Sequence, residues 1–251
     1  PADYAILAGS IDKSRMGRAF AMHTFTGNLG FALAPPVIAL LAAALGWRAS
    51  LLIVGLLGVP VVAAILVQSR ILRDQAKPRA SEAGPSGREL LLSRSILLFF
   101  GFFLLSSMAG AGIQAFVITV LGQLWGTPVA IASMVLTGYM VGATSGTLVG
   151  GWVVDATKRN LMGFVVVLTL FAAAMILALG LLPMPDLILP VVALLGGLAM
   201  GASRTPRDIM LKDASPPGQI GKVFGFVSSG LPLGSAVTPV PLWLLIDLGH
   251  P

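Results

Sequence analysis

A few polar side chains stand alone inside long apolar stretches of the sequence, where an unpaired polar group costs roughly several kcal/mol. The candidates for contact with a solute or a proton are His23, Asn28, Gln114, Tyr139 and Ser228. His23 is the most informative, because a histidine can change its charge near neutral pH. The alternative is a neutral histidine bonded to a backbone carbonyl. For Gln114 and Tyr139, a hydrogen bond between two helices fits the pattern equally well.

The sequence carries no arrangement typical of an enzyme or a metal site. It has no cysteine, and all ten aspartates and glutamates lie outside the apolar stretches or at their ends. We find no phosphate-binding loop, no cluster of metal ligands and no nucleophile beside a base. We therefore expect no catalytic residue, no cofactor and no metal. A proton that crosses the membrane part would then need His23 or a group in helices that precede this sequence.

The elements that position these side chains are predicted to be membrane-spanning helices. Hydrophobic residues make up 56% of the chain and charged residues 10%, against about 45–50% and about 25% in soluble domains. A helix needs roughly 20 apolar residues to cross a bilayer. Seven stretches meet this length: 18–45, 49–67, 95–121, 129–154, 161–182, 187–203 and 223–246.

The basic residues alternate with these stretches and predict an orientation. The loops 1–18, 70–94, 155–160 and 204–222 hold fifteen lysines and arginines, whereas the other loops hold only Arg48. Basic loops face the cytoplasm, so we expect these four loops on that side of a bacterial inner membrane. The net charge of +6 is explained by this topology, and we expect no nucleic-acid partner.

One segment occurs twice. Gly17–Pro35 reads GRAFAMHTFTGNLGFALAP, and Gly221–Pro239 reads GKVFGFVSSGLPLGSAVTP, 204 positions later. Six positions correspond without a gap: Gly17 with Gly221, Arg18 with Lys222, Phe20 with Phe224, Leu29 with Leu233, Gly30 with Gly234 and Pro35 with Pro239. Six predicted helices separate the copies, which indicates two related halves in parallel repeat.

The boundary between the halves is predicted from composition. Residues 70–94 are rich in Lys, Arg, Pro, Gly and Ser, and such a segment cannot bury itself, so we expect a flexible linker in water. The predicted organisation is the last part of a first half at 1–69, the linker at 70–94, and a second half without its last helix at 95–251.

Small residues and prolines within the repeat predict close packing and bending. Glycine lets another helix approach, and proline leaves a carbonyl without its partner and bends the helix. The positions that we assign to this role are Gly30 and Pro35 with their counterparts Gly234 and Pro239.

The repeat organisation and a loop motif resemble those of the major facilitator superfamily of secondary transporters. The motif is GGWVVDATKR, in which Gly151, Asp155, Lys158 and Arg159 fit the family signature. The resemblance covers the whole chain, from the end of helix four to helix eleven of twelve. It implies an all-α membrane protein, a helical bundle with two parallel six-helix repeats that is incomplete at both ends.

The resemblance also implies a gate on the cytoplasmic side, formed by Asp155 and the helix that begins at Gly17 and Arg18. Independently, the first amides of a helix lack partners and favour a carboxylate. The alternative is local pairing of Asp155 with Lys158 or Arg159. A second charged group follows the sixth stretch, and it is either a solvated loop or a gate of ion pairs. Its members are Arg204, Arg207, Asp208, Lys212 and Asp213.

The function implied by the resemblance is secondary transport by alternating access. The run that ends in Ala34-Pro35 resembles the antiporter pattern of the family, and the opening PADYAILAGSIDKSRMGRAF resembles fosmidomycin-resistance exporters. We therefore expect proton-coupled export of small organic molecules by a monomer in the lipid bilayer. The alternatives are import of organic acids by symport, and a receptor or scaffold of the same fold that transports nothing.

Overall fold

The computed structural model describes residues 2–68, 87–157, 160–216 and 218–248. Within these ranges the chain is helical and has no strand. The first part contains α1 (Ala2–Ser10), the 3-10 helix η1 (Lys13–Arg15), α2 (Met16–Leu45), α3 (Trp47–Leu56) and α4 (Gly58–Gln68). The second part contains α5 (Gly87–Leu91), α6 (Arg94–Trp125), α7 (Val129–Thr157), α8 (Leu161–Leu181), α9 (Leu189–Ala214), α10 (Ile220–Ser228), α11 (Gly230–Val237) and α12 (Pro239–Asp247).

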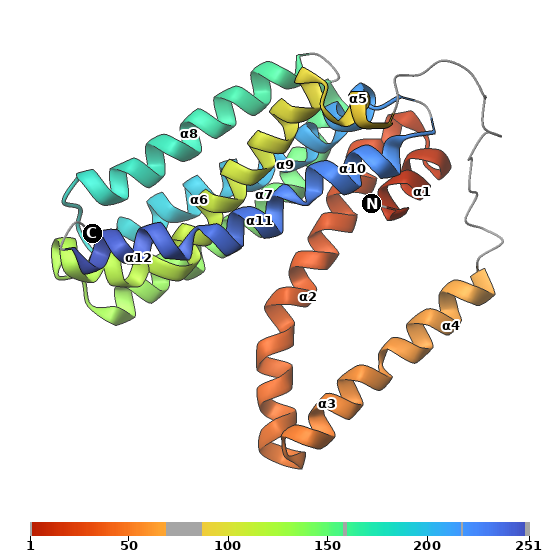
Figure 1. Cartoon of the computed structure of the whole chain (residues 1–251). Helices are drawn as coiled ribbons and strands as arrows, with labels where there is room; N and C mark the ends of the chain where they lie inside the picture. Colours follow the sequence, from red (N-terminus) through yellow and green to blue (C-terminus); the bar gives the residue numbers. More distant parts are fainter. Residues whose placement is uncertain (1, 69–86, 158–159, 217, 249–251) are drawn as a thin grey trace.

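The second part forms a bundle, and the first part meets it at one end (Figure 1). There, α1 and the beginning of α2 lie beside α10, and α2 then diverges from the bundle. A sharp turn at Gly46 leads into α3. The Gly46 φ of 79° is one that glycine adopts readily and other residues rarely do. The Ser50 hydroxyl closes this turn by donating to the Gly46 carbonyl at 2.8 Å. Helices α3 and α4 stand apart from the bundle.

Five of the seven predicted spans lie in helical segments long and apolar enough to cross a membrane. They are Trp47–Val67, Arg94–Trp125, Val129–Ala156, Leu161–Leu181 and Ile220–Asp247. The other two, 18–45 and 187–203, are helical within α2 and α9. With the family match described below, these helices make the chain an all-α integral membrane protein.

The prediction of a possible loop after residue 203 was wrong in one respect. Helix α9 continues to Ala214 and buries Arg207 and Asp208 inside the bundle, whereas the Asp213 side chain is 64% exposed. Arg207 is 8% exposed and Asp208 is 3% exposed. They tolerate burial because Arg207 Nε and Nη2 donate to Asp208 Oδ1 at 3.0 and 2.9 Å, so each charge has its opposite beside it.

The closest helix packing joins α7 to α9. A methyl group at Gly142, Gly146 or Gly150 would collide with a backbone carbonyl of α9. These glycines recur every four residues, so they form a continuous stripe without side chains along one face of α7. Gly197 and Gly201 on α9 face carbonyls of α7 in the same way. The two backbones therefore approach as closely as small residues allow.

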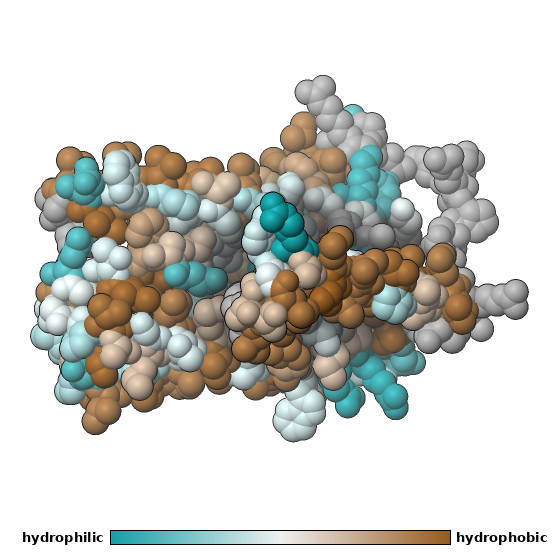
Figure 2. Space-filling view, turned by 90° about the horizontal axis from the view of Figure 1, so that it is seen from below, coloured by the Kyte–Doolittle hydropathy of each residue, from teal (hydrophilic) through white to brown (hydrophobic). Residues whose placement is uncertain are grey.

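Apolar side chains cover much of the outer surface, which is the arrangement expected of a protein in lipid. Figure 2 shows hydrophobic residues over a large share of one face. On α4, Leu66 and Val67 are 68% and 81% exposed. A soluble monomer rarely exposes apolar surface on this scale.

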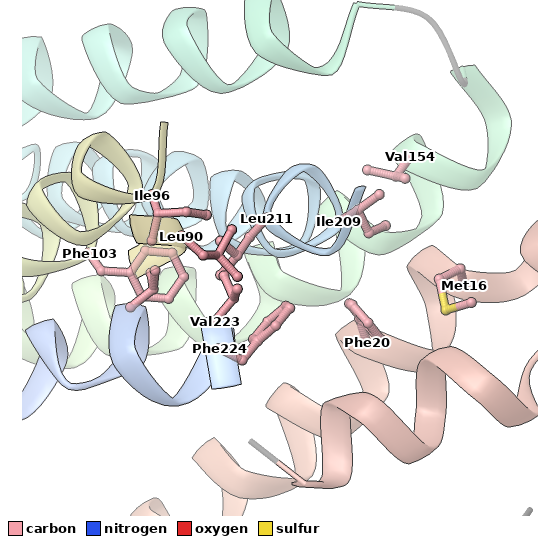
Figure 3. Close-up of a cluster of buried hydrophobic side chains, with 11 residues drawn as sticks. Met16, Phe20, Leu90, Ile96, Phe103, Val154, Ile209, Leu211, Val223 and Phe224 are labelled. Atoms are coloured by element: carbon pink, nitrogen blue, oxygen red, sulfur yellow. The ribbon is translucent and has the colours of Figure 1, made fainter. Parts of the chain in front are cut away.

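A hydrophobic cluster fills the end of the bundle where α2 meets α10, and we call it the end cluster. Figure 3 shows its side chains on facing helices. Its buried members are Met16, Phe20, Leu90, Ile96, Phe103, Val154, Ile209, Leu211, Val223, Phe224 and Val227. Leu90 comes from α5, inside the segment 70–94 that we predicted as a solvated linker, so the prediction was wrong for residues 87–91. Most of the remaining linker lies outside the described residues.

Candidate functional site

Two adjoining cavities lie among α2, α6 and α9, and α7 lines the second of them. The first has a volume of about 630 Å³ and also reaches α1 and α10 to α12. The second has a volume of about 660 Å³. Asn28, Gln114 and Arg204 line both of them. Each cavity has the size that small-molecule sites have, and both apolar and polar side chains line it.

Most of the predicted pathway residues line this space. Asn28 and Gln114 line both cavities, Ser228 lines the first, and Tyr139 lines the second. Tyr139 is only 3% exposed, and its hydroxyl has no hydrogen-bond partner among the described residues. A buried hydroxyl without a partner costs free energy.

His23 lies apart from the other predicted pathway residues. It is not among the residues that line either cavity. Its Nε2 lies 2.9 Å from Asp3 Oδ2, and its side chain is 37% exposed. The ring of Tyr4 packs edge-on against it with centroids 5.2 Å apart. A role of His23 in proton movement stays a prediction, and its partner is the Asp3 carboxylate.

Tyr4 occupies the boundary between the two repeat copies. Its ring stacks on Phe224 at 4.8 Å and packs edge-on against Phe20 at 5.0 Å, and these phenylalanines are counterparts in the repeat. Its hydroxyl donates to Asp208 Oδ2 at 3.3 Å and lies 3.2 Å from Thr24 Oγ1. Tyr4 and Asp208 also correspond under the offset of 204 positions. Tyr4, Thr24, Asp208 and Phe224 line the first cavity.

The contact expected between Asp155 and the start of α2 is present. Asp155 Oδ1 accepts from the Gly17 amide at 2.8 Å, and Oδ2 accepts from the Arg18 amide at 3.1 Å. The Arg18 Nε donates to the same Oδ2 at 2.9 Å. The Asp155 side chain is 7% exposed and that of Arg18 is 57% exposed. The carboxylate thus satisfies two amides of the first turn and meets the positive end of the helix dipole.

Glycine at position 17 allows this contact. A methyl group there would lie 2.6 Å from the Gly151 carbonyl oxygen and 2.7 Å from Asp155 Oδ1. Gly151 approaches α2 equally closely, since a methyl group on it would collide with Ala21. Lys158 and Arg159, the other members of the loop motif, lie outside the described residues, so the alternative of local pairing remains open there.

The two copies of the predicted packing motif differ. A methyl group at Gly234 would lie 2.5 Å from the Leu104 carbonyl oxygen of α6, whereas one at Gly30 would meet nothing within 4 Å. Among the described residues none packs against Gly30, because α2 has already left the bundle at that position, so helix packing at Gly30 stays a prediction. Helix α2 runs through Pro35 without a break, whereas α12 starts at Pro239.

Two features of the site escaped the sequence reasoning. Arg204 lines both cavities, yet we had grouped it with a loop, because arginine after an apolar stretch is typical of a membrane boundary. The glycines of α7 recur every four residues from Gly138 to Gly150. That spacing is a sequence signal for close helix packing, and it could have paired α7 with a neighbour.

The fold and the site define a class: an all-helical integral membrane protein with a cavity between its helices. The model of the Major Facilitator Superfamily matches residues 1–119 and 100–249. The chain therefore belongs to this superfamily, whose members are generally secondary transporters and not enzymes. A comparison with curated proteins returns no match.

Proposed function

We propose that this protein is a secondary transporter that exports small organic molecules in exchange for protons and works by alternating access. The observation that carries the proposal is the space between α2 and the bundle, which polar and apolar side chains line together. We take this space to be closed where the two repeat copies meet at Tyr4. In this reading a solute binds in the space, and the two halves rock around it.

The closed end of the space is, in this proposal, the cytoplasmic gate. Tyr4 with Phe20, Phe224 and Asp208 forms its inner part. The contact of Asp155 with the first turn of α2 forms its outer part. This assignment follows the basic loops, which predict that this end faces the cytoplasm. The divergence of α2 from the bundle then corresponds to an opening toward the other side (Figure 1).

The strength of the Asp155 contact suits a gate. A carboxylate at a helix start contributes roughly 0.3–1 kcal/mol when exposed and up to about 2 kcal/mol when partly buried. Such a contribution shifts an equilibrium between two conformations that differ by a few kcal/mol. It is too small to determine whether the protein folds.

Proton coupling is assigned to the Asp3–His23 pair. The two groups lie within 2.9 Å, and Tyr4 contacts His23 on one side and Asp208 on the other. A change of charge at this pair therefore reaches the proposed gate through one side chain.

The test is counterflow in proteoliposomes with defined pH on each side. We expect accumulation of labelled solute against an outward gradient of the same unlabelled solute, and stimulation when the proton gradient opposes solute movement. Stimulation by a gradient in the same direction as solute movement would replace export by symport. Saturable binding without counterflow would show a receptor of this fold.

A further inference from the structure

The cavity carries one positive charge without a partner. Three charged residues line the first cavity, and two of them, Arg207 and Asp208, form an ion pair at 2.9 Å. The third is Arg204, which also lines the second cavity, where it is the sole charged lining residue. Within the described part of the chain Arg204 makes no ion pair or hydrogen bond. Asp208 attracts Arg204 from a distance but is already paired with Arg207. A partly buried guanidinium without an ion pair of its own is costly, so the space favours a negatively charged ligand.

Further hydrogen-bond donors converge near the same place. A methyl group built on Gly110 would lie 3.6 Å from the Tyr139 hydroxyl oxygen and 3.9 Å from Gln114 Nε2. The Tyr139 hydroxyl and the Gln114 amide therefore both lie beside Gly110, which has no side chain to separate them. The Tyr139 hydroxyl is buried and has no partner among the described residues, which independently indicates that a ligand atom belongs there.

We propose that Arg204, with Tyr139 and Gln114, binds the anionic group of a small organic anion, namely a carboxylate, phosphate or phosphonate. The guanidinium presents a planar fork of donors that matches two oxygens of such a group. The hydroxyl and the amide supply donors to the remaining oxygens. The inference rests on the proposed transport function, because it names the substrate class of the same cavity.

The rest of the ligand lies against apolar side chains. Phe25, Met140 and Leu148 line the second cavity beside Arg204. A ligand that buries a hydrocarbon or aromatic body there and pairs its charge with Arg204 satisfies both parts of the site. A cationic ligand has no described carboxylate free to receive it, because Asp208 is already paired with Arg207.

The charge of the site can be tested before any substrate is known. The sequence has no cysteine, so Ser145→Cys places a single thiol on the exposed lining of the second cavity. We measure its rate of modification by the anionic sulfonatoethyl and the cationic trimethylammonioethyl methanethiosulfonates in membranes. Because a nearby unit charge acts oppositely on the two reagents, Arg204→Gln should lower the anion-to-cation rate ratio about tenfold. Arg48→Gln, at the α2–α3 turn, is the control and should leave the ratio unchanged.

Ligand binding is tested by protection of the same thiol from a neutral maleimide. The probes are benzoate, propylphosphonate, the neutral isostere benzamide and tetraethylammonium. We expect at least one anion to protect the thiol saturably. Its apparent Kd should weaken at least about tenfold in Arg204→Gln and several-fold in Tyr139→Phe. Arg204→Lys should keep the rate ratio but weaken binding, because it retains the charge and loses the fork.

Several results would overturn the proposal. They are an unchanged rate ratio in Arg204→Gln, equal protection by benzamide or tetraethylammonium, and no protection by any anion. If Arg204→Gln fails to insert, the Arg204→Lys and Tyr139→Phe results decide. Saturable protection by an anion without counterflow would leave the anion site and remove the transport function. Counterflow of a neutral or cationic solute that is insensitive to Arg204→Gln would support the transport function and remove the anion site.

Discussion

The two copies of the repeated segment begin alike and then differ. Phe20 and Phe224 occupy corresponding positions, are 0% and 1% exposed, and both contact the ring of Tyr4. Beyond them, no residue of α2 after Ala21 whose burial is described is buried. The second copy continues along α6, where the Ser107 hydroxyl donates to the Leu231 carbonyl at 2.6 Å.

This difference shows which properties a repeated sequence determines. The shared pattern places a small residue, a basic residue and a buried phenylalanine at the start of each helix. It does not determine how far the helix stays in contact with its neighbours, because that depends on what lies opposite. In the second copy a backbone carbonyl of α6 lies against Gly234, and in the first copy the space beside Gly30 is open.

The shared start can be tested by removing each phenylalanine. Phe20→Ala and Phe224→Ala should each lower stability by about 3–5 kcal/mol, since both truncate a fully buried aromatic side chain. The measurement is thermal unfolding in detergent, followed by tryptophan fluorescence. Phe171→Ala, on an α8 position that is 42% exposed, is the control and should change little. A loss at only one of the two buried positions would contradict their equivalence.

The different packing of the two copies beyond these phenylalanines can be tested by adding one methyl group to each copy. Gly234→Ala should destabilise the protein by about 1–3 kcal/mol, because the added carbon meets the Leu104 carbonyl oxygen and overpacks the α6–α11 contact. Gly30→Ala should be neutral in stability or gain up to about 1 kcal/mol, because alanine favours a helix over glycine. Both are read from the same unfolding experiment. Slower counterflow in Gly30→Ala with unchanged stability would show that Gly30 packs in the other conformation.

The sequence predicted the class of fold and much of the site, because apolar length and isolated polar residues are local signals. Gln114 and Tyr139 line the cavity as expected, and Asp155 meets the start of α2. Arg204 could not be assigned, because a basic residue after an apolar stretch resembles a loop until its neighbours are known. The loose packing of α2 at Gly30 also escaped prediction, since the repeat implied that both copies pack alike.

The contact at the start of the first copy should respond to the charge of Asp155. Asp155→Asn keeps one acceptor oxygen but loses the charge that faces two amides and the helix dipole, so it should weaken the contact by roughly 0.3–2 kcal/mol. We expect normal insertion, a bias toward the conformation open at this end, and slower counterflow. The bias is measured as a changed rate of maleimide modification at Ser145→Cys. An unchanged rate would leave Asp155 as a structural cap without a gating role.

We expect the smallest effect from removing the Arg18 side chain, which contacts Asp155 together with the backbone amides of the first turn of α2. Arg18 and Lys222 are counterparts in the repeat, and only the first has a described ion pair, at 2.9 Å from Asp155. Because the Arg18 side chain is 57% exposed, its pair is worth at most about 1 kcal/mol and is screened by salt. Arg18→Gln leaves both backbone donors to Asp155 in place, so its effect on the modification rate at Ser145→Cys should be smaller than that of Asp155→Asn.

The effect of Arg18→Gln should vanish near 1 M salt, whereas the effect of Asp155→Asn should partly persist, since the carboxylate is nearly buried. Lys222→Gln is the matched control and should change nothing. If Arg18→Gln equals Asp155→Asn at all salt concentrations, the exposed ion pair carries the contact and the helix start does not.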